Sequence, residues 1–383
     1  MNSTLHESPI TTKDIVRPTR VQVNERRIRD NYKAIKTLVS PARIMPVLKA
    51  NAYGHGILRI AQIMQEEGAD YLGVAFLEEG ILLRENHIDI PILVLGGILG
   101  NQIPHFLEHN LTITASSIDK LGAVQEVAAE RGVKAKVHLK IDTGMERIGV
   151  HYYNAEGFIR ASASLANVDV EGIYTHFANA DAADLTHTRL QLERFDQVLS
   201  LYETLGLDPP PLIHAANSGA VVRLPESRYT MVRPGILLYG VYPSEDVPRT
   251  LEVHPALTWK SNVVYFKVIQ PGHPVGYGST WRAVEPTRAV TVPVGYGDGY
   301  FRSMSGKAEV LIRGKRYPVI GTISMDQIVV AIGQDSAYNG DEVILVGEAD
   351  GGSIGAEDLA GWSGTIPYEI LTNINTRVPR VYT

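Results

Sequence analysis

Apolar residues in the first two thirds of the chain fall in short runs that alternate with longer amphipathic segments. The segments 58–67, 118–131 and 188–205 carry apolar residues at three- and four-residue spacing, which predicts helices. The short runs between them predict buried strands at 44–48, 71–76, 92–95, 111–115, 137–141, 170–175, 212–214 and 229–232. Strand and helix alternate eight times, so we expect a (β/α)₈ barrel of the TIM type.

An open, doubly wound sheet is the alternative topology for such a pattern. That topology is favoured by a glycine fingerprint G-x-G-x-x-G after the first strand, and the sequence after residue 48 has none.

The pattern changes after residue 239. Tight-turn signals at 270–272, 313–315 and 339–341 separate the later apolar segments. These predict strands at 258–268, 289–294, 308–312, 318–323, 328–332 and 342–346, short helices at 356–362 and 368–373, and a last extended segment at 378–382. We expect a second, mostly β domain.

The N-terminal region contributes one strand and one helix before the barrel. Residues 19–23 alternate like a half-buried strand, and Asn24 is placed to cap an amphipathic helix over 28–38. The domains expected are an N-terminal segment 1–23, whose strand 19–23 packs with the β domain, a cofactor-binding barrel 24–250, and the β domain 251–383.

Composition narrows the class of protein. The 383 residues include 36 Lys+Arg against 42 Asp+Glu, a net charge of −6 that argues against nucleic acid or an anionic membrane as the main partner. There is no cysteine, so disulfides and thiolate metal sites are excluded. Residues 1–20 lack the apolar core of a secretory signal, and the strongest apolar run, 90–99, is shorter than the about 20 residues that span a bilayer. We expect a cytoplasmic protein.

The chemistry of a barrel gathers where its strands end, and Lys49 follows the first predicted strand. Burial of its neighbours is expected to lower the pKa of the amine and make it a nucleophile toward an aldehyde. An isolated strand-end lysine more often leaves the strand for solvent. Tyr53, four residues on, and the flanking Gly54 and Gly56 favour a site, because glycine permits close approach of backbone to a ligand.

Two loops resemble anion sites, at 218–219 and 235–236. Small residues at a helix start expose backbone N–H groups, and barrels often bind phosphate after strands seven and eight. The Walker motif G-x-x-x-x-G-K-[ST] is absent from the sequence. A small phosphorylated cofactor attached through Lys49 is therefore favoured over a nucleotide.

Two further strand ends carry ring or guanidinium groups. His176 has no carboxylate or second histidine at a ligand spacing, so stacking or hydrogen bonding is expected of it rather than metal binding. Arg233 stays protonated, so it would donate to a pyridine nitrogen without protonating it, unless it only forms a strand-end ion pair.

Eight motifs carry a resemblance to a known family. They occur at 47–56, 140–147, 174–177, 216–218, 232–236, 275–278, 324–327 and 366–369. In this order and over nearly the whole chain, they resemble the alanine racemase family, pyridoxal-phosphate enzymes of fold type III. The resemblance implies a (β/α)₈ barrel, a β domain and a head-to-tail homodimer with shared active sites.

The resemblance also implies roles for single residues. Lys49 would hold pyridoxal 5'-phosphate covalently, and Tyr277 of the partner subunit would be the second catalytic residue. The implied cofactor-binding residues are Lys49, Tyr53, Arg147, His176, Asn217, Ser218, Arg233, Gly235, Ile236 and Tyr368. Arg147 and the backbone N–H of Met325 would bind the substrate carboxylate. Family members place residues matching Asp181, Tyr296, Arg302 and Ile366 along the substrate corridor, and some carbamylate the lysine at the Lys140 position.

The implied function is interconversion of L- and D-alanine by a two-base mechanism, supplying D-alanine for peptidoglycan. The alternative is a racemase for serine or basic amino acids, because Ser324 and Thr322 depart from residues common in the family near the corridor. Decarboxylases of the same fold type place a carboxylate on the pyridine nitrogen and a cysteine in the β domain, whereas this chain has Arg233 and no cysteine. Pyridoxal-phosphate carrier proteins lack a second domain.

Overall fold

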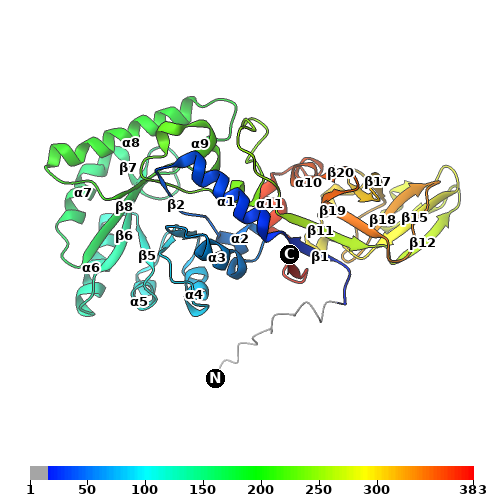
Figure 1. Ribbon diagram of the computed structural model, residues 1–383, viewed down its shortest axis with the longest axis horizontal. Coiled ribbons are helices and arrows are strands. Elements are labelled where there is room, and N and C mark those ends of the chain that lie inside the picture. The colour runs from blue at the N-terminus through cyan, green and yellow to red at the C-terminus, as the bar shows by residue number, and fades with distance from the viewer. Residues whose placement is uncertain (1–15) are drawn as a thin grey trace, which may run out of the picture. The chain divides into compact units, whose positions relative to one another are not determined.

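A computed structural model describes residues 16–383, which divide into two compact units (Figure 1). The barrel unit is Arg27–His254, and the β unit combines the described residues up to Arg26 with Pro255–Thr383. The domain limits expected near residues 23 and 250 stay a prediction, and residues 1–15 of the expected N-terminal segment lie outside the described residues.

Eight parallel strands form the centre of the barrel unit. They are β2 (Arg43–Ile44), β3 (Leu72–Val74), β4 (Ile92–Val94), β5 (Thr112–Ala115), β6 (Ala135–Asp142), β8 (Val168–Tyr174), β9 (Leu212–His214) and β10 (Met231–Val232). Six pair in the order β3-β4-β5-β6-β8-β9, and β10 pairs with β2. A bridge between Val47 and Gly73 and a backbone bond from the N–H of Thr230 to the carbonyl of Ile213 close the ring. The predicted (β/α)₈ barrel is confirmed.

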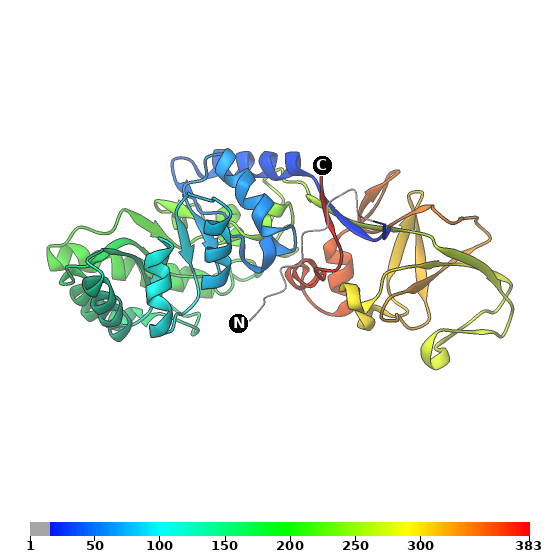
Figure 2. The ribbon, with the colours of Figure 1, turned by 90° about the horizontal axis from the view of Figure 1, so that it is seen from below.

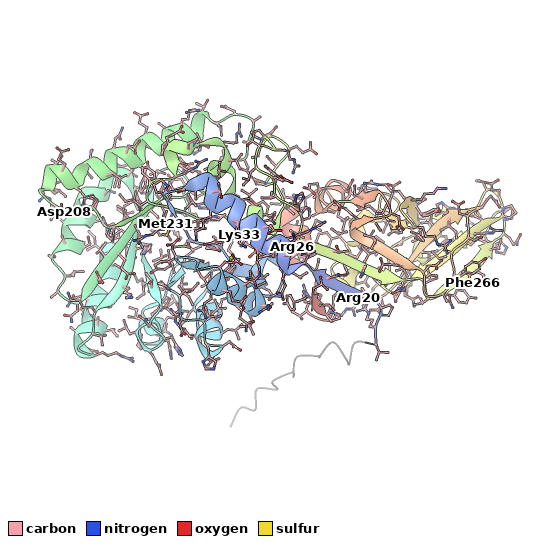
Figure 3. All side chains as sticks on the ribbon, in the orientation of Figure 1. Arg20, Arg26, Lys33, Asp208, Met231 and Phe266 are labelled. Carbon is pink, nitrogen blue, oxygen red and sulfur yellow. The ribbon has the colours of Figure 1, made fainter. Side chains whose placement is uncertain are left out.

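Helices surround these strands (Figures 1 and 2). They are α1 (Glu25–Val39), α3 (Ile57–Glu66), α4 (Leu77–Glu85), α5 (Ile103–Glu108), α6 (Ile118–Glu130), α7 (Ala155–Ala163), α8 (Thr186–Leu205) and α9 (Ser218–Arg223). Each helix buries its apolar stripe, as α3 does with Ile60 and Ile63. A cluster of buried residues that includes Tyr71, Tyr174 and Met231 packs together in this unit. Figure 3 labels Met231 among the strands of the barrel unit. Side chains therefore fill the space between the strands, and polar groups can gather only at the strand ends.

The β unit is one long sheet with a short hairpin and two helices. Its strands run β12 (Tyr265–Ile269), β15 (Thr287–Val292), β18 (Ile328–Gly333), β17 (Lys315–Ile320), β16 (Glu309–Ile312), β19 (Glu342–Ala349), β11 (Leu257–Asn262), β1 (Arg20–Val23) and β21 (Arg380–Tyr382), with β20 (Gly352–Ile354) beside β19. The hairpin pairs β13 (Pro274–Val275) with β14 (Trp281–Arg282), and the helices are α10 (Ala356–Ser363) and α11 (Pro367–Thr372). The predicted, mostly β second domain is confirmed.

The prediction of one strand over 258–268 is wrong. The segment divides into β11, which pairs with β1 and β19, and β12, which pairs with β15. The break falls where the backbone N–H of Val263 binds the carbonyl of Asp341 and that of Val264 binds the carbonyl of Thr291. The chain thus changes partner strand without a glycine or proline to mark the change.

Among residues 16–383, no helix is long and apolar enough to cross a membrane.

Candidate active site

Lys49 lies at the carboxyl end of the first barrel strand, as expected. Regular pairing of that strand is limited to Arg43–Ile44, because Pro46 has no N–H, but Val47 still donates to the carbonyl of Pro234. Val47 and Leu48 are buried, while the Lys49 side chain is open to solvent at the mouth. Nearby protein atoms lower the pKa of Lys49 by desolvation, the Arg147 cation lowers it further, and the Glu79 carboxylate opposes them.

The chain after Lys49 makes a left-handed helical turn. Ala50, Asn51, Ala52 and Tyr53 have φ values of 53°, 55°, 53° and 52°. Each such residue costs about 1–2 kcal/mol for an L-amino acid, so local bonds must hold the turn. The N–H of Ala52 binds the carbonyl of Leu48 at 2.7 Å, and Asn51 Oδ1 accepts the N–H of Ile57 at 2.9 Å. The chain therefore turns here with the opposite hand to an ordinary helix.

Tyr53 reaches the loop after the eighth strand. It is 5 % exposed, and a Cβ added to Gly235 would lie 2.4 Å from the Tyr53 hydroxyl oxygen. Ser218 Oγ accepts the N–H of Gly235 at 2.9 Å and that of Leu237 at 3.3 Å. Three strand ends thus bring Tyr53, Ser218 and Gly235 together, with Ile236 buried beside them. Hydroxyls and backbone N–H groups gathered in this way make a candidate anion cradle, and a side chain at position 235 would fill it.

Asn217 shapes the start of the helix behind this cradle. Its Oδ1 accepts the N–H of Ala220 at 3.2 Å, which makes it the N-cap of α9, and its amide donates to the carbonyl of Phe177. Asn217 directly precedes Ser218 in the chain and therefore lies beside the cradle.

Arg233 is 3 % exposed and donates into the protein on several sides. Its Nη2 binds the carbonyls of Thr175 at 2.7 Å and Ala215 at 3.0 Å and lies 3.3 Å from Nδ1 of His176. Burial lowers the pKa of Arg233 to about 10, so the guanidinium remains charged at neutral pH. Burial, then the Arg233 charge, lowers the pKa of His176 well below its ordinary value, so that imidazole is neutral.

Asp142 fixes the loop that carries Arg147. Its carboxylate accepts four backbone N–H groups, including those of Gly144 at 2.8 Å and Arg147 at 3.1 Å. These bonds outweigh the effect of burial and lower the pKa of Asp142. The Arg147 side chain is exposed at the mouth, where its charge acts on Lys49.

Lys140 is buried at the end of β6 without a hydrogen-bond partner for its amine among the described residues. The amine lies 4.6 Å from the centroid of the Tyr174 ring. Burial, followed by the Arg233 charge, lowers the pKa of Lys140 well below its ordinary value. Lys140 is therefore protonated less readily in this environment than an exposed lysine.

The remaining expected residues belong to the β unit, except for Asp181 of the barrel unit. Tyr277 follows β13 and is 73 % exposed, and Met325, Ile366 and Tyr296 are 52 %, 56 % and 42 % exposed. Arg302 is also exposed, and Tyr368 lies on α11. That these residues lie at the mouth of a barrel in the active enzyme stays a prediction. In residues 16–383 no group of three His, Asp or Glu side chains could hold a metal ion.

Glu79 and Asp142 lie at the mouth, and His214 is buried behind it; the sequence alone assigns a role to none of them. An acidic residue in the first turn of a helix is a recognised signal, but it indicates a helix start rather than a contact with Lys49. His214 ends the seventh strand, and its burial and its bond to Arg233 depend on strands that only the closed barrel brings together.

Comparisons with known proteins agree with this arrangement. The model of "Alanine racemase, N-terminal domain" matches residues 23–243, and that of "Alanine racemase, C-terminal domain" matches residues 256–382. The alanine racemase of Carboxydothermus hydrogenoformans is 46 % identical over 369 residues, which cover 96 % of this chain and all of that protein. A solved alanine racemase of Clostridium difficile is 39 % identical with a TM-score of 0.90 and 96 % of each chain covered. One from Streptomyces lavendulae is 36 % identical with a TM-score of 0.91, covering 96 % of this chain and 97 % of that one.

The fold defines a protein of the α/β-barrel class with an added β domain. The two family models and the full-length relatives show that the chain belongs to the alanine racemase family. Enzymes of this family depend on pyridoxal phosphate. The residues of the barrel mouth fit that group, because the cradle suits a phosphate and Lys49 offers an amine of lowered pKa to an aldehyde.

Proposed function

We propose that the protein interconverts L- and D-alanine with pyridoxal 5'-phosphate as its cofactor. The observation that carries the proposal is the Lys49 amine, which shares a barrel mouth with the cradle of Tyr53, Ser218 and Gly235 in a chain matched over its length by alanine racemases. D-alanine made in this way would serve peptidoglycan synthesis in the cytoplasm.

The proposed cofactor site uses residues from several strand ends. Lys49 would bind the aldehyde, and the phosphate would be held by Tyr53, Ser218, Gly235, Ile236 and Tyr368, with Asn217 beside them as a further cofactor-binding residue. His176, which is neutral, would stack on the ring, and Arg147 would meet the phenolate oxygen and the substrate carboxylate. When bound, the cofactor supplies an electron sink that acidifies the Cα proton of the amino acid.

Arg233 would face the pyridine nitrogen as a hydrogen-bond donor. Its guanidinium keeps its protons at neutral pH, because even the lowered pKa of about 10 lies well above 7. Nη2 of the same guanidinium donates to the carbonyls of Thr175 and Ala215, and these bonds fix the orientation of the guanidinium. A nitrogen left unprotonated limits charge delocalisation into the ring and should suppress transamination.

Racemisation needs a proton acceptor and donor on each face of the substrate. The neutral Lys49 amine would take the Cα proton from D-alanine, and the phenolate form of Tyr277 would take it from L-alanine. After one group has removed the proton from its own face, the other would donate a proton from the opposite face, so the configuration at Cα is inverted. The lowered pKa of Lys49 suits this role, because a neutral amine is the form that accepts a proton.

The proposed site is shared between the two subunits of a homodimer. The β unit exposes Tyr277, Met325 and Ile366, and exposed aromatic and apolar side chains of this kind are typical of surfaces that another chain covers. In the proposed dimer Tyr277 and the N–H of Met325 enter the partner's barrel mouth, with Asp181, Tyr296, Arg302 and Ile366 along the corridor.

The proposal is tested with purified protein and added pyridoxal phosphate. We expect the visible absorbance of a lysine-bound cofactor, and formation of D-alanine from L-alanine. The Lys49→Ala variant should lose both, while Lys33→Ala on the surface helix α1 should keep both (Figure 3). L-serine and L-lysine assayed in parallel distinguish a broader racemase. A colourless protein that leaves all three amino acids unchanged would contradict the proposal.

A further inference from the structure

One carboxylate links the loop after β3 to the peptide that follows Lys49. Glu79 lies in the first turn of α4, where its Oε2 accepts the N–H of Ala75 at 2.7 Å and that of Phe76 at 3.3 Å. Such bonds are usual for an acidic residue at a helix start. Its Oε1, however, accepts the N–H of Ala50 at 2.7 Å, from a residue 29 positions earlier in the chain. Both oxygens are therefore used, and they hold two strand-end loops together.

Ala50 is the place where such a bond has the most effect. It is the first of the four left-handed residues, with φ 53°, and Ala50 and Ala52 have no polar side chain that could hold the turn. Asn51 secures the far side of the turn through Ile57, whereas Glu79 secures the side next to Lys49. Without the carboxylate, a strained backbone segment next to the reactive amine would lose the bond that holds its first residue.

We propose that Glu79 is a positioning residue for Lys49, because its carboxylate holds the Ala50 peptide against the start of α4 and so fixes the amine at the barrel mouth. The chemistry that Lys49 then performs rests on the proposed function, but the positioning does not.

The charge of Glu79 gives it a second effect on the same amine. The ionisable groups that act on Lys49 are Arg147, from the loop after β6, and Glu79, and the neutral His176 lies at the same mouth. Arg147 favours the neutral amine, and Glu79 is the anion that counteracts it. Glu79 therefore accepts a hydrogen bond from the Ala50 N–H and also places a negative charge that counteracts the effect of Arg147 on Lys49.

The first test measures hydrogen exchange by mass spectrometry in the full-length protein as purified. Glu79→Gln keeps the size of the side chain, but its amide has only one accepting oxygen and cannot bind N–H groups on both sides. We expect faster exchange in a peptide covering residues 48–54, with little change in α8 or in the β unit. Glu78→Gln, at an exposed neighbouring position in the same turn, is the matched control and should exchange like the parent protein.

The second test measures acylation of Lys49 by an amine-reactive ester after the cofactor has been removed, with peptide mass spectrometry as the readout. Loss of the Glu79 charge leaves Arg147 unopposed, so more of the amine is neutral at pH 7. We expect Lys49 to be labelled about threefold to tenfold faster in Glu79→Gln than in Glu78→Gln. A purely structural role as a helix cap would lower the melting temperature without changing this rate.

Unchanged exchange at residues 48–54 together with an unchanged labelling rate would overturn the proposal. If Glu79→Gln does not fold, Glu79→Asp replaces it, and faster exchange at 48–54 supports the proposal while parent-like exchange overturns it. Neither readout uses substrate or bound cofactor. A lack of racemase activity in the parent protein would therefore contradict the proposed function and leave the result for Glu79 standing.

Discussion

Arg233 donates a hydrogen bond from Nη1 to Nδ1 of His214 at 2.7 Å. A guanidinium only donates, so Nδ1 of His214 is the acceptor and its proton lies on Nε2. That nitrogen lies 2.8 Å from Nδ1 of His138, which must accept in turn. Burial lowers the pKa of His138 to about 3, and that of His214 also falls well below its ordinary value, so both rings are neutral. One buried cation thus determines the tautomers of two histidines behind the site.

Replacing Arg233 by lysine should destabilise the barrel unit. An ammonium group cannot supply the directed donors that Thr175, Ala215 and His214 now share, and each buried acceptor without a donor costs about 1–3 kcal/mol. We expect a loss of about 2–4 kcal/mol in the free energy of unfolding by urea. Arg160→Lys, on the exposed surface of α7, is the control and should change little. Equal stability of the two variants would contradict the role given to Arg233.

Gly235→Ala should weaken cofactor binding more than it weakens the fold. The new Cβ would lie 2.4 Å from the Tyr53 hydroxyl, so the cradle must widen or lose its shape. We expect the dissociation constant for pyridoxal phosphate to rise about tenfold to hundredfold, measured by titration of the protein freed of cofactor. Gly122→Ala, where an added Cβ meets nothing within 4 Å, should bind like the parent protein.

Lys140 should react with carbon dioxide. Carbamylation requires a neutral amine, and the resulting anion would face the charges of Arg233 and Arg147 that now disfavour an ammonium. We expect one additional ¹³C signal after incubation with labelled bicarbonate, absent from Lys140→Met. Lys136→Met, four positions earlier on β6, should retain the signal. A parent protein without the signal would exclude the modification under these conditions.

Asp298 should make the stability of the β unit depend on pH. Burial opposes its ionisation, but hydrogen bonds from Arg17 and Arg377, both at 2.7 Å, outweigh burial and lower the pKa of Asp298. A lowered carboxyl pKa contributes stability above the unfolded value of about 3.9, and this stability disappears as the pH falls through the folded value.

Asp298→Asn should therefore lose about 2–3 kcal/mol at pH 7, and its difference from the parent protein should shrink below about pH 4. Urea unfolding across this pH range measures both effects. Asp208→Asn, at an exposed position, is the control (Figure 3). A difference that stays constant down to acid pH would show that the ion pairs are not its source.

Tyr277→Phe should impair one direction of proton removal more than the other. If Tyr277 takes the proton of L-alanine and Lys49 that of D-alanine, exchange of the Cα proton of L-alanine with deuterated water should fall about a hundredfold or more. Exchange from D-alanine should fall less. Tyr338→Phe, another exposed tyrosine of the β unit, should affect neither. Equal losses for the two enantiomers would contradict the two-base assignment.

The periodicity of the sequence predicts most of the fold because burial of strands and helices depends on local pattern. All eight barrel strands, and Lys49 at the end of the first, follow from apolar runs. The break between β11 and β12 could not be predicted, because it arises from a change of partner strand and not from a residue type.

The candidate site was predictable only in part. Lys49, Ser218 and Gly235 carry local signals, but the left-handed turn at 50–53 includes a bond from the Ala50 N–H to Glu79, which lies far away in sequence. Asp142 likewise accepts hydrogen bonds from backbone N–H groups, such as those of Gly144 and Arg147. Almost every residue type carries such a group, so the sequence does not indicate these bonds. The proposed position of Tyr277 opposite Lys49 would require a second chain, so a pattern within one chain cannot establish it.

Strand β1 lies between β11 and β21, with the N–H of Glu25 bonded to the carbonyl of Thr383. During synthesis, residues 20–23 leave the ribosome more than two hundred residues before either neighbour exists. They must therefore wait unpaired while the barrel region is translated, and a chaperone or a non-native strand has access to them in that interval. Completion of the β unit consequently has to wait until β11 and β21 have both been synthesised.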